Sequence, residues 1–236
     1  MAKSPIPKIT RAQAREELMA QILDIARSYL GTEGAAGISL RAIARDMGMV
    51  SSGIYRYVPT RDALLTLLIT DAYNSLGVSA AKSEKAIPRK DRQERFLAIA
   101  HAARNWALNH PHEYALIFGT PVPGYKAPEA TIAPATIIPQ LLTVILRDTK
   151  KAGQSKSSTK VSELVSSSVA PLQKKLAQDL PAELILRGLN AWSSMFGAIS
   201  FEIFGHTHNV VASDSKKRKA YFDHQMRTLI QSLNVA

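Results

Sequence analysis

Apolar residues recur at helical intervals through most of the 236-residue chain, and no segment alternates with the period of two that is typical of a strand. The pattern therefore predicts an all-α fold. Shorter helices are expected at residues 51–57 and 112–118, and a weaker pattern predicts one at 162–178. The longer helices are expected at residues 11–30, 39–47, 60–79, 91–110, 133–149, 181–203 and 215–233.

Near the N-terminus, two short helices joined by a tight turn are followed by a third helix that starts after a proline, which is the layout of a helix-turn-helix and predicts two domains. We expect a three-helix helix-turn-helix DNA-binding domain at residues 8–60, a linking helix at about 60–79, and a larger helical regulatory and dimerisation domain at 80–236. The polar, basic stretch around 80–90 is predicted to be the hinge between them. Residues 153–160 have the composition of a linker.

Turn and cap residues mark the expected helix boundaries in the first domain. Glycine provides the positive backbone angle of a sharp turn, serine and threonine cap helix N-termini, and the residue before a proline is pushed out of the helical region. In chain order these residues are Gly31, Gly34, Ser39, Gly48, Pro59 and Thr60.

Residues 51–57 have the chemistry of a helix that enters the major groove. Small serines let the backbone approach, tyrosine hydroxyls reach phosphates, and Arg56 is the best candidate for a bidentate contact to guanine. Arg61 stands in the first turn of a helix, where the dipole disfavours a cation, so a nearby phosphate would explain it. The predicted DNA contacts are Ser39, Arg41, Ser51, Ser52, Gly53, Tyr55, Arg56, Tyr57, Thr60 and Arg61.

The net charge of +11 suggests a polyanionic partner, but its distribution weakens that argument. Residues 1–62 hold nine Lys/Arg and six Asp/Glu and so carry only +3 of it. A solvated cationic surface accounts for most of the remainder. The case for DNA therefore depends on the arrangement of residues rather than on the isoelectric point.

Several classes of protein are disfavoured by what the sequence lacks. There is no cysteine, which fits a reducing cytoplasm, and no run of 18 apolar residues, so no membrane span is expected. The N-terminus has no apolar signal core. Phosphate loops, HExxH and GxSxG are absent, so no enzyme is predicted. His206 and His208 lack a matching carboxylate, so neither a metal nor a cofactor is expected.

The run ISLRAIARDMGMVSSGIYRYVPTRDALL resembles the DNA-binding pattern of TetR-type repressors at Ile43-Ala44, Gly48, Tyr55, Tyr57 and Arg61. The family usually has lysine at the last of these positions, where it grips phosphate. Val50 stands where the family often has a capping serine or threonine, so the cap is expected to shift to Ser51. Val58 replaces a common phenylalanine.

The segments NHPHEYALIFGTPVPGY and AWSSMFGAISFEIFGH resemble the regulatory domain of TetR-type proteins that are named for a Trp-His-Gly signature. Trp192 and Gly197 are present, but Phe196 stands at the position of the histidine. The resemblance implies a homodimer formed through the last two helices. Aromatics with polar tips are typical of small-molecule pockets, and the alternative for most of them is an ordinary place in the core. The candidates for an effector site are Trp106, His110, Tyr114, Phe118, Tyr125, Trp192 and Phe196.

The leading hypothesis is a ligand-responsive regulator, most simply a repressor. Its two recognition helices would read a pseudo-palindromic double-stranded operator with half-sites about 34–36 Å apart or a multiple of that distance. An unidentified small molecule would bind the C-terminal domain and release the DNA. The alternative is a basic nucleic-acid-binding protein without sequence preference, whose affinity would fall steeply with salt.

Overall fold

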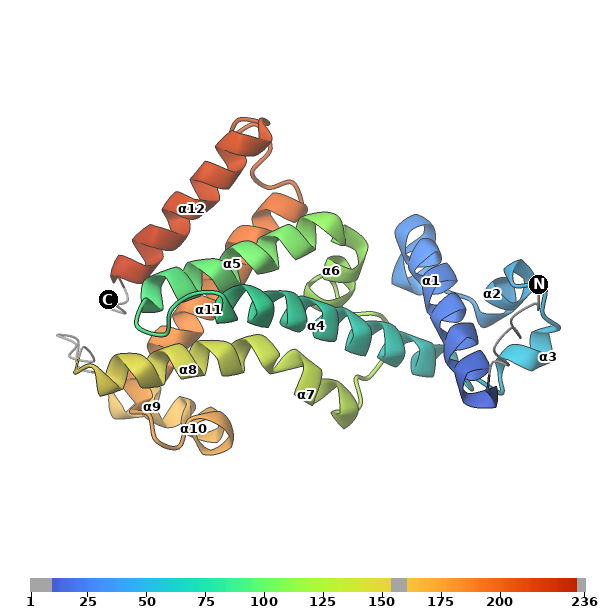
Figure 1. Cartoon of the computed structure of the whole chain (residues 1–236), viewed down its shortest axis with the longest axis horizontal. Coiled ribbons are helices and arrows are strands. Elements are labelled where there is room, and N and C mark those ends of the chain that lie inside the picture. The colour runs from blue at the N-terminus through green and yellow to red at the C-terminus, as the bar shows by residue number, and fades with distance from the viewer. Residues whose placement is uncertain (1–9, 154–160, 233–236) are drawn as a thin grey trace, which may run out of the picture. The chain divides into compact units, whose positions relative to one another are not determined.

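A computed structural model describes residues 10–153 and 161–232, and these residues form helices and turns without a strand. The all-α prediction is therefore confirmed for the described part of the chain. Figure 1 labels the elements. The elements are α1 (Arg11–Gly37), α2 (Leu40–Asp46), α3 (Ser51–Ile54), α4 (Arg61–Lys85), α5 (Arg92–Asn109), α6 (Pro111–Phe118), a 3-10 turn (Glu129–Thr131), α7 (Ile132–Ala135), α8 (Ile137–Lys151), α9 (Glu163–Ser168), α10 (Ala170–Leu176), α11 (Ala182–Ile203) and α12 (Ser215–Ser232).

The contacts within the chain define two compact units. The first comprises residues 1–72 and 112–131, and the second comprises residues 73–111 and 132–236. Helix α4 begins in the first unit and ends in the second. This division differs from the expected domains, because 112–131 groups with the N-terminal helices rather than with the remainder of the C-terminal region.

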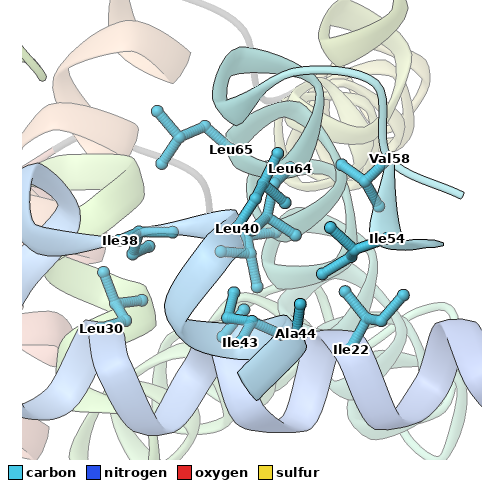
Figure 2. Packing of buried hydrophobic residues seen from close by; sticks show 12 residues of the cluster. Ile22, Leu30, Ile38, Leu40, Ile43, Ala44, Ile54, Val58, Leu64 and Leu65 are labelled. Carbon is cyan, nitrogen blue, oxygen red and sulfur yellow. The ribbon is translucent and has the colours of Figure 1, made fainter. Parts of the chain in front are cut away.

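The core of the first unit is formed by side chains from α1 to the first turns of α4. Figure 2 shows Ile22, Ile43 and Ile54 directed toward one another from α1, α2 and α3, and all three are fully buried. Val58 and Leu64 close the same cluster. Burial of each such side chain contributes about 1.5–3 kcal/mol, so these apolar contacts hold the short α2 and α3 in place.

Helix α1 starts at Arg11, as predicted, and is interrupted at Gly34, one of the two glycines expected to close it. It starts with a capping box in which Thr10 and Gln13 exchange hydrogen bonds between side chain and backbone. The helix continues past Leu30 and Gly31 up to that break, and a further helical turn runs to Gly37. The break falls at Gly34, whose φ of 67° and ψ of 178° suit glycine.

Other helix boundaries also differ from the expected ones. Helix α4 continues to Lys85, so the non-helical connection to α5 is shorter than the expected hinge at 80–90. The expected helix at 133–149 is two helices with a break at Thr136, because Pro139 is tolerated only in the first turn of a helix. The weak helix at 162–178 is likewise two, with Pro171 in the first turn of α10. Most of the expected linker, residues 154–160, lies outside the described residues.

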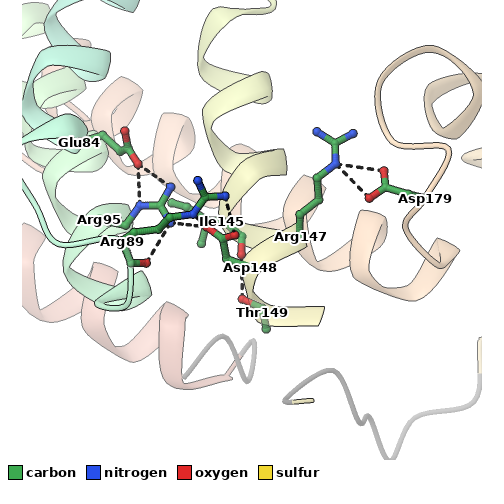
Figure 3. A network of polar contacts seen from close by, with 8 residues as sticks. All are labelled: Glu84, Arg89, Arg95, Ile145, Arg147, Asp148, Thr149 and Asp179. Carbon is green, nitrogen blue, oxygen red and sulfur yellow. Dashed lines mark hydrogen bonds and ion pairs between the residues drawn. The ribbon is translucent and has the colours of Figure 1, made fainter. Parts of the chain in front are cut away.

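In the second unit, α5 lies against α8, α11 and α12. Charged pairs join it to its neighbours. Arg95 donates to Glu84 at 2.6 Å and to Asp148 of α8 at 2.7 Å, and Arg89 donates to Asp148 at 2.9 Å (Figure 3). The Arg95 side chain is 4% exposed and that of Asp148 is 10% exposed, so the Arg95–Asp148 pair lies inside the unit.

A second buried arginine of α5 pairs with α11. Arg104 makes a bidentate pair with Glu202, with both N–O distances at 2.6 Å. His101 contacts Asp223 of α12 through its Nε2 at 2.9 Å. The expectation of a solvated cationic surface is therefore wrong for Arg95 and Arg104, which are buried and paired with carboxylates.

No single helix in the described part of the chain is both long and apolar enough to cross a membrane. One bent pair, Glu129–Ala135 with Ile137–Lys151, meets the length and composition criteria only when the two helices are taken together.

Candidate nucleic-acid interface

Helices α2 and α3 are joined by a tight turn. Ser39 caps α2, with its hydroxyl accepting from the Ala42 N–H at 3.4 Å, and Gly48 turns the chain at φ 65°. Met49 N–H then donates to the Ala44 carbonyl at 2.8 Å, which ties the turn back to α2. The cap at Ser39 and the turn at Gly48 are both confirmed. Buried Ile43 and Ile54 hold the two helices together.

Helix α3 is shorter than expected and carries no side-chain cap. It ends at Ile54 rather than Tyr57, and the next three residues form turns before Pro59. Its N-cap residue is Val50, which is 71% exposed and makes no side-chain cap hydrogen bond. The expected shift of the cap to Ser51 is therefore wrong, because Ser51 is already the first helical residue.

The outward side of α3 and the following turn is polar. Ser51, Ser52, Tyr55 and Arg56 are exposed. Small hydroxyls beside a guanidinium can donate to phosphates and to base edges. These four predicted residues therefore share the surface that a duplex would meet.

The other predicted contacts are placed differently. Gly53 is buried, and a Cβ there would lie 3.3 Å from the Met49 side chain, so its lack of a side chain serves internal packing. Tyr57 is half-buried beneath Arg15, whose guanidinium lies 5.5 Å from the ring centroid. Thr60 caps α4 by accepting from the Ala63 N–H at 3.0 Å, as predicted. Arg41 is exposed on α2.

Arg61 has partners that the sequence did not reveal. Its guanidinium donates to the carbonyls of Ala35 at 2.6 Å, Ala36 at 3.3 Å and Ile38 at 3.3 Å. Carbonyls at the end of α1 thus compensate for a cation at the start of α4. A phosphate is not needed to explain its position, and a phosphate contact at Arg61 stays a prediction.

Residues 112–131 pack on the core of the N-terminal helices through Leu116, Val122 and Tyr125, and polar pairs add to these apolar contacts. Tyr125 Oη lies 2.9 Å from Thr66 Oγ1 of α4, and Arg27 of α1 pairs with Asp71 at 2.6 Å and with Glu113 at 3.8 Å. Sequence reasoning missed these pairs, because their members lie 44 to 86 residues apart and share no local motif.

The predicted effector residues occupy both units. In the first unit, Tyr114 is fully buried with its ring 5.0 Å from that of Phe118, and Tyr125 contacts Thr66. In the second unit, buried Trp106 donates to Ser75 at 2.9 Å, and its ring stacks on His110 at 4.9 Å.

Trp192 and Phe196 form a separate pair on α11, with ring centroids 5.8 Å apart. Trp192 is half-buried and lines an apolar cleft in the second unit, whereas Phe196 is buried. Of the seven predicted effector residues, only Trp192 lines that cleft. A common effector site for all seven stays a prediction.

Within the described residues, no group of three or more His, Cys, Asp or Glu side chains is placed to hold a metal ion.

A capped helix, a glycine turn and a second helix with an exposed polar side define a helix-turn-helix protein. Residues 96–229 match the family model described as the tetracyclin repressor-like C-terminal domain. The chain is 35% identical over 225 residues to the HTH-type transcriptional regulators Rv1816 of Mycobacterium tuberculosis and Mb1846 of Mycobacterium bovis, covering 94% of this chain and 95% of each relative. The chain therefore belongs to the TetR family.

Solved structures agree with this assignment. The crystal structure of SCO4313, described as a regulatory protein, aligns with a TM-score of 0.75 at 31% identity, covering 94% of this chain and 99% of that chain. The TetR family regulator PfmR of Thermus thermophilus aligns with a TM-score of 0.58 at 14% identity, covering 89% and 97%, and shows the shared fold.

Proposed function

We propose that this protein is a DNA-binding transcriptional regulator that reads duplex DNA with α3 and the turn after it. The observation that carries the proposal is the contrast between buried Ile54 and Val58 and exposed Ser52 and Arg56 within one short segment. The apolar side chains fix the segment to the core and leave its polar side available to the groove. Membership of the TetR family supports this function.

We further propose that the protein acts as a homodimer through α11 and α12. Three large aromatic side chains on these helices and at the end of α11 are exposed in the single chain: Phe201 by 58%, Phe204 by 42% and Tyr221 by 42%. Exposed apolar groups of this size are typical of protein contacts. A two-fold dimer would present two copies of α3 to a pseudo-palindromic operator.

Regulation by a small molecule completes the proposal. An effector that binds the DNA-free conformation better would lower operator affinity by about 5–150-fold, for a coupling of about 1–3 kcal/mol. Repression released by the effector is the simplest output of such coupling. We infer a regulator rather than an enzyme, and this inference rests on the family.

The test begins with selection of fragments from the source genome by the purified protein. The enriched fragment is then titrated with wild type, with Arg56→Ala and with Lys85→Ala, which removes an exposed cation from the end of α4 in the second unit. We expect Arg56→Ala to weaken binding by about 1–3 kcal/mol, and Lys85→Ala to bind like wild type. Equal affinity of wild type and Arg56→Ala, with both folded, contradicts the proposal.

The alternative is binding to nucleic acid without sequence preference. Pairing of Arg95, Arg104 and Arg187 with carboxylates disfavours it, because these buried cations are not free for phosphates. Equal affinity for the selected fragment and for random DNA at fixed salt would favour this alternative over a specific regulator.

A further inference from the structure

An apolar cleft of about 230 Å³ lies in the second unit between α8, α10 and α11. Its walls include Leu142 and Leu146 of α8, Leu176 of α10, and Leu189 and Trp192 of α11. None of the described residues that line it is charged. The volume exceeds the about 150 Å³ of an engineered cavity that binds benzene, so a small organic molecule fits it.

Polar contacts anchor one wall of the cleft. Arg147 of α8 donates to Asp179 at 3.0 Å and to the Leu176 carbonyl at 3.0 Å, which fastens the end of α10 to α8 (Figure 3 shows the pair with Asp179). On the opposite wall, a Cβ at Gly188 would lie 2.6 Å from Leu146 Cδ1, so α8 and α11 approach closely. The cleft is thus bounded by elements that are held in place.

The threonine hydroxyls that line the cleft determine whether a ligand there can donate or accept a hydrogen bond. The Thr143 hydroxyl donates to the Pro139 carbonyl at 2.8 Å, and the Thr136 hydroxyl donates to the Ala133 carbonyl at 2.9 Å. Because both hydrogens are used, the hydroxyl oxygens can only accept. Thr136 Oγ1 already accepts from Gln140 at 3.2 Å, which leaves Thr143 Oγ1 as the better acceptor for a ligand O–H.

We propose that this cleft is the effector site and that it takes an uncharged, largely apolar molecule with one hydrogen-bond donor. A charged ligand would lose its hydration without gaining an ion pair, because no lining side chain carries a charge. The cleft was not part of the predicted aromatic site, with which it shares only Trp192.

Helix α8, which forms one wall of the cleft, also contacts α4 within the second unit. Ile137 of α8 packs on Gly77 of α4, where a Cβ would lie 2.7 Å from the isoleucine side chain. Helix α4 is continuous back to Arg61. The regulatory meaning of the site rests on the proposed function, whereas its ligand chemistry does not.

The first experiment compares 1-octanol, octanoate and octylammonium by calorimetric titration of the full-length protein. These probes share one chain and differ in charge. We expect octanol to bind at one site per chain and the two ions at least about tenfold more weakly. Equal binding of all three, or no binding of octanol, overturns the proposal.

Two variants place the binding in the cleft. Leu176→Phe fills the cavity and is expected to abolish octanol binding, whereas its matched control Lys174→Phe, on the exposed side of the same helix, retains it. Thr143→Val removes the acceptor and is expected to weaken binding about fivefold, the equivalent of one hydrogen bond of about 1 kcal/mol. Circular dichroism checks the fold of each. If Leu176→Phe and Thr143→Val both bind octanol with wild-type affinity, the assignment of the octanol site to this cleft is wrong.

The final measurement is affinity for the genomic fragment with and without saturating octanol. We expect weakening by about 5–150-fold in wild type and none in Leu176→Phe. If the protein binds octanol but enriches no genomic fragment, the ligand site in the cleft is supported and the proposed regulator function is contradicted. Fragment affinity that octanol leaves unchanged overturns the effector site and leaves the regulator standing. If Leu176→Phe alters the oligomeric state instead, the cleft is a subunit contact and the proposal fails.

Discussion

Arg61 and Ala35 join the start of α4 to the end of α1, with Arg61 Nη2 2.6 Å from the Ala35 carbonyl oxygen. The same guanidinium also reaches the carbonyls of Ala36 and Ile38. One side chain therefore satisfies acceptors that the end of α1 leaves open, and it fixes the chain just before α2.

The Arg61 contacts predict that Arg61→Ala lowers stability by about 2 kcal/mol, because hydrogen bonds from a charged donor are lost. Urea unfolding measures the loss. The slope of log K against log salt for DNA binding tests the predicted phosphate contact separately, because a residue that only positions the chain neutralises no phosphate and leaves this slope unchanged. A slope reduced by about one would instead assign a phosphate contact to Arg61.

The uncapped start of α3 predicts a stabilising substitution. Val50→Ser places a hydroxyl at the N-cap, where it can accept from the amides of the first turn, and we expect a gain of about 1 kcal/mol. Val78→Ser, at an exposed position inside α4, controls for the loss of an exposed valine and gains no cap. Thermal unfolding compares the two, and equal melting temperatures would show that the cap does not form.

The close packing of α4 on α8 predicts that Gly77→Ala is destabilising. Its Cβ would lie 2.7 to 2.9 Å from three Ile137 atoms, including Cβ, which cannot easily move away. We expect a net loss of about 1–2 kcal/mol, because overpacking exceeds the helix propensity gained by alanine. Asn74→Ala, on the exposed side of the same helix, is expected to cost nothing. Chemical denaturation of both variants tests the contrast.

The buried network around Asp148 predicts sensitivity to acid. Burial raises the pKa of Asp148, but hydrogen bonds and attraction from Arg89 and Arg95 outweigh it, so its pKa is lowered. The resulting stabilisation is complete above the unfolded value of about 3.9 and is lost as pH falls through the lower folded value. Urea midpoints from pH 7 down to about pH 2 measure this loss, which we expect below about pH 4.

Asp148→Asn is expected to cost about 3 kcal/mol at pH 7, because the buried charge of Arg95 would keep Glu84 as its remaining carboxylate partner. The variant should also lose less stability than wild type on acidification. Asp179→Asn breaks an exposed pair and should cost far less. A similar loss in the two variants would contradict the assigned role of burial.

Local patterns predicted the helix-turn-helix well. Ser39, Gly48 and Thr60 act as the sequence indicated, because a cap or turn depends on neighbouring residues alone. The patterns did not predict the partners of Arg61 or the pairing of Tyr125 with Thr66. Such contacts join residues that are distant in the chain. The residue type alone does not show whether an arginine or a tyrosine has a protein partner or faces solvent.

The buried arginines of α5 have a consequence for how the second unit can assemble. Arg95 and Arg104 meet carboxylates on different helices, so α5 has few alternative alignments. A slip of one turn along its axis would strand two guanidinium groups in the interior, at several kcal/mol each. Apolar side chains alone would tolerate such a misalignment. The two buried arginines therefore fix the position of α5 along its axis relative to the neighbouring helices.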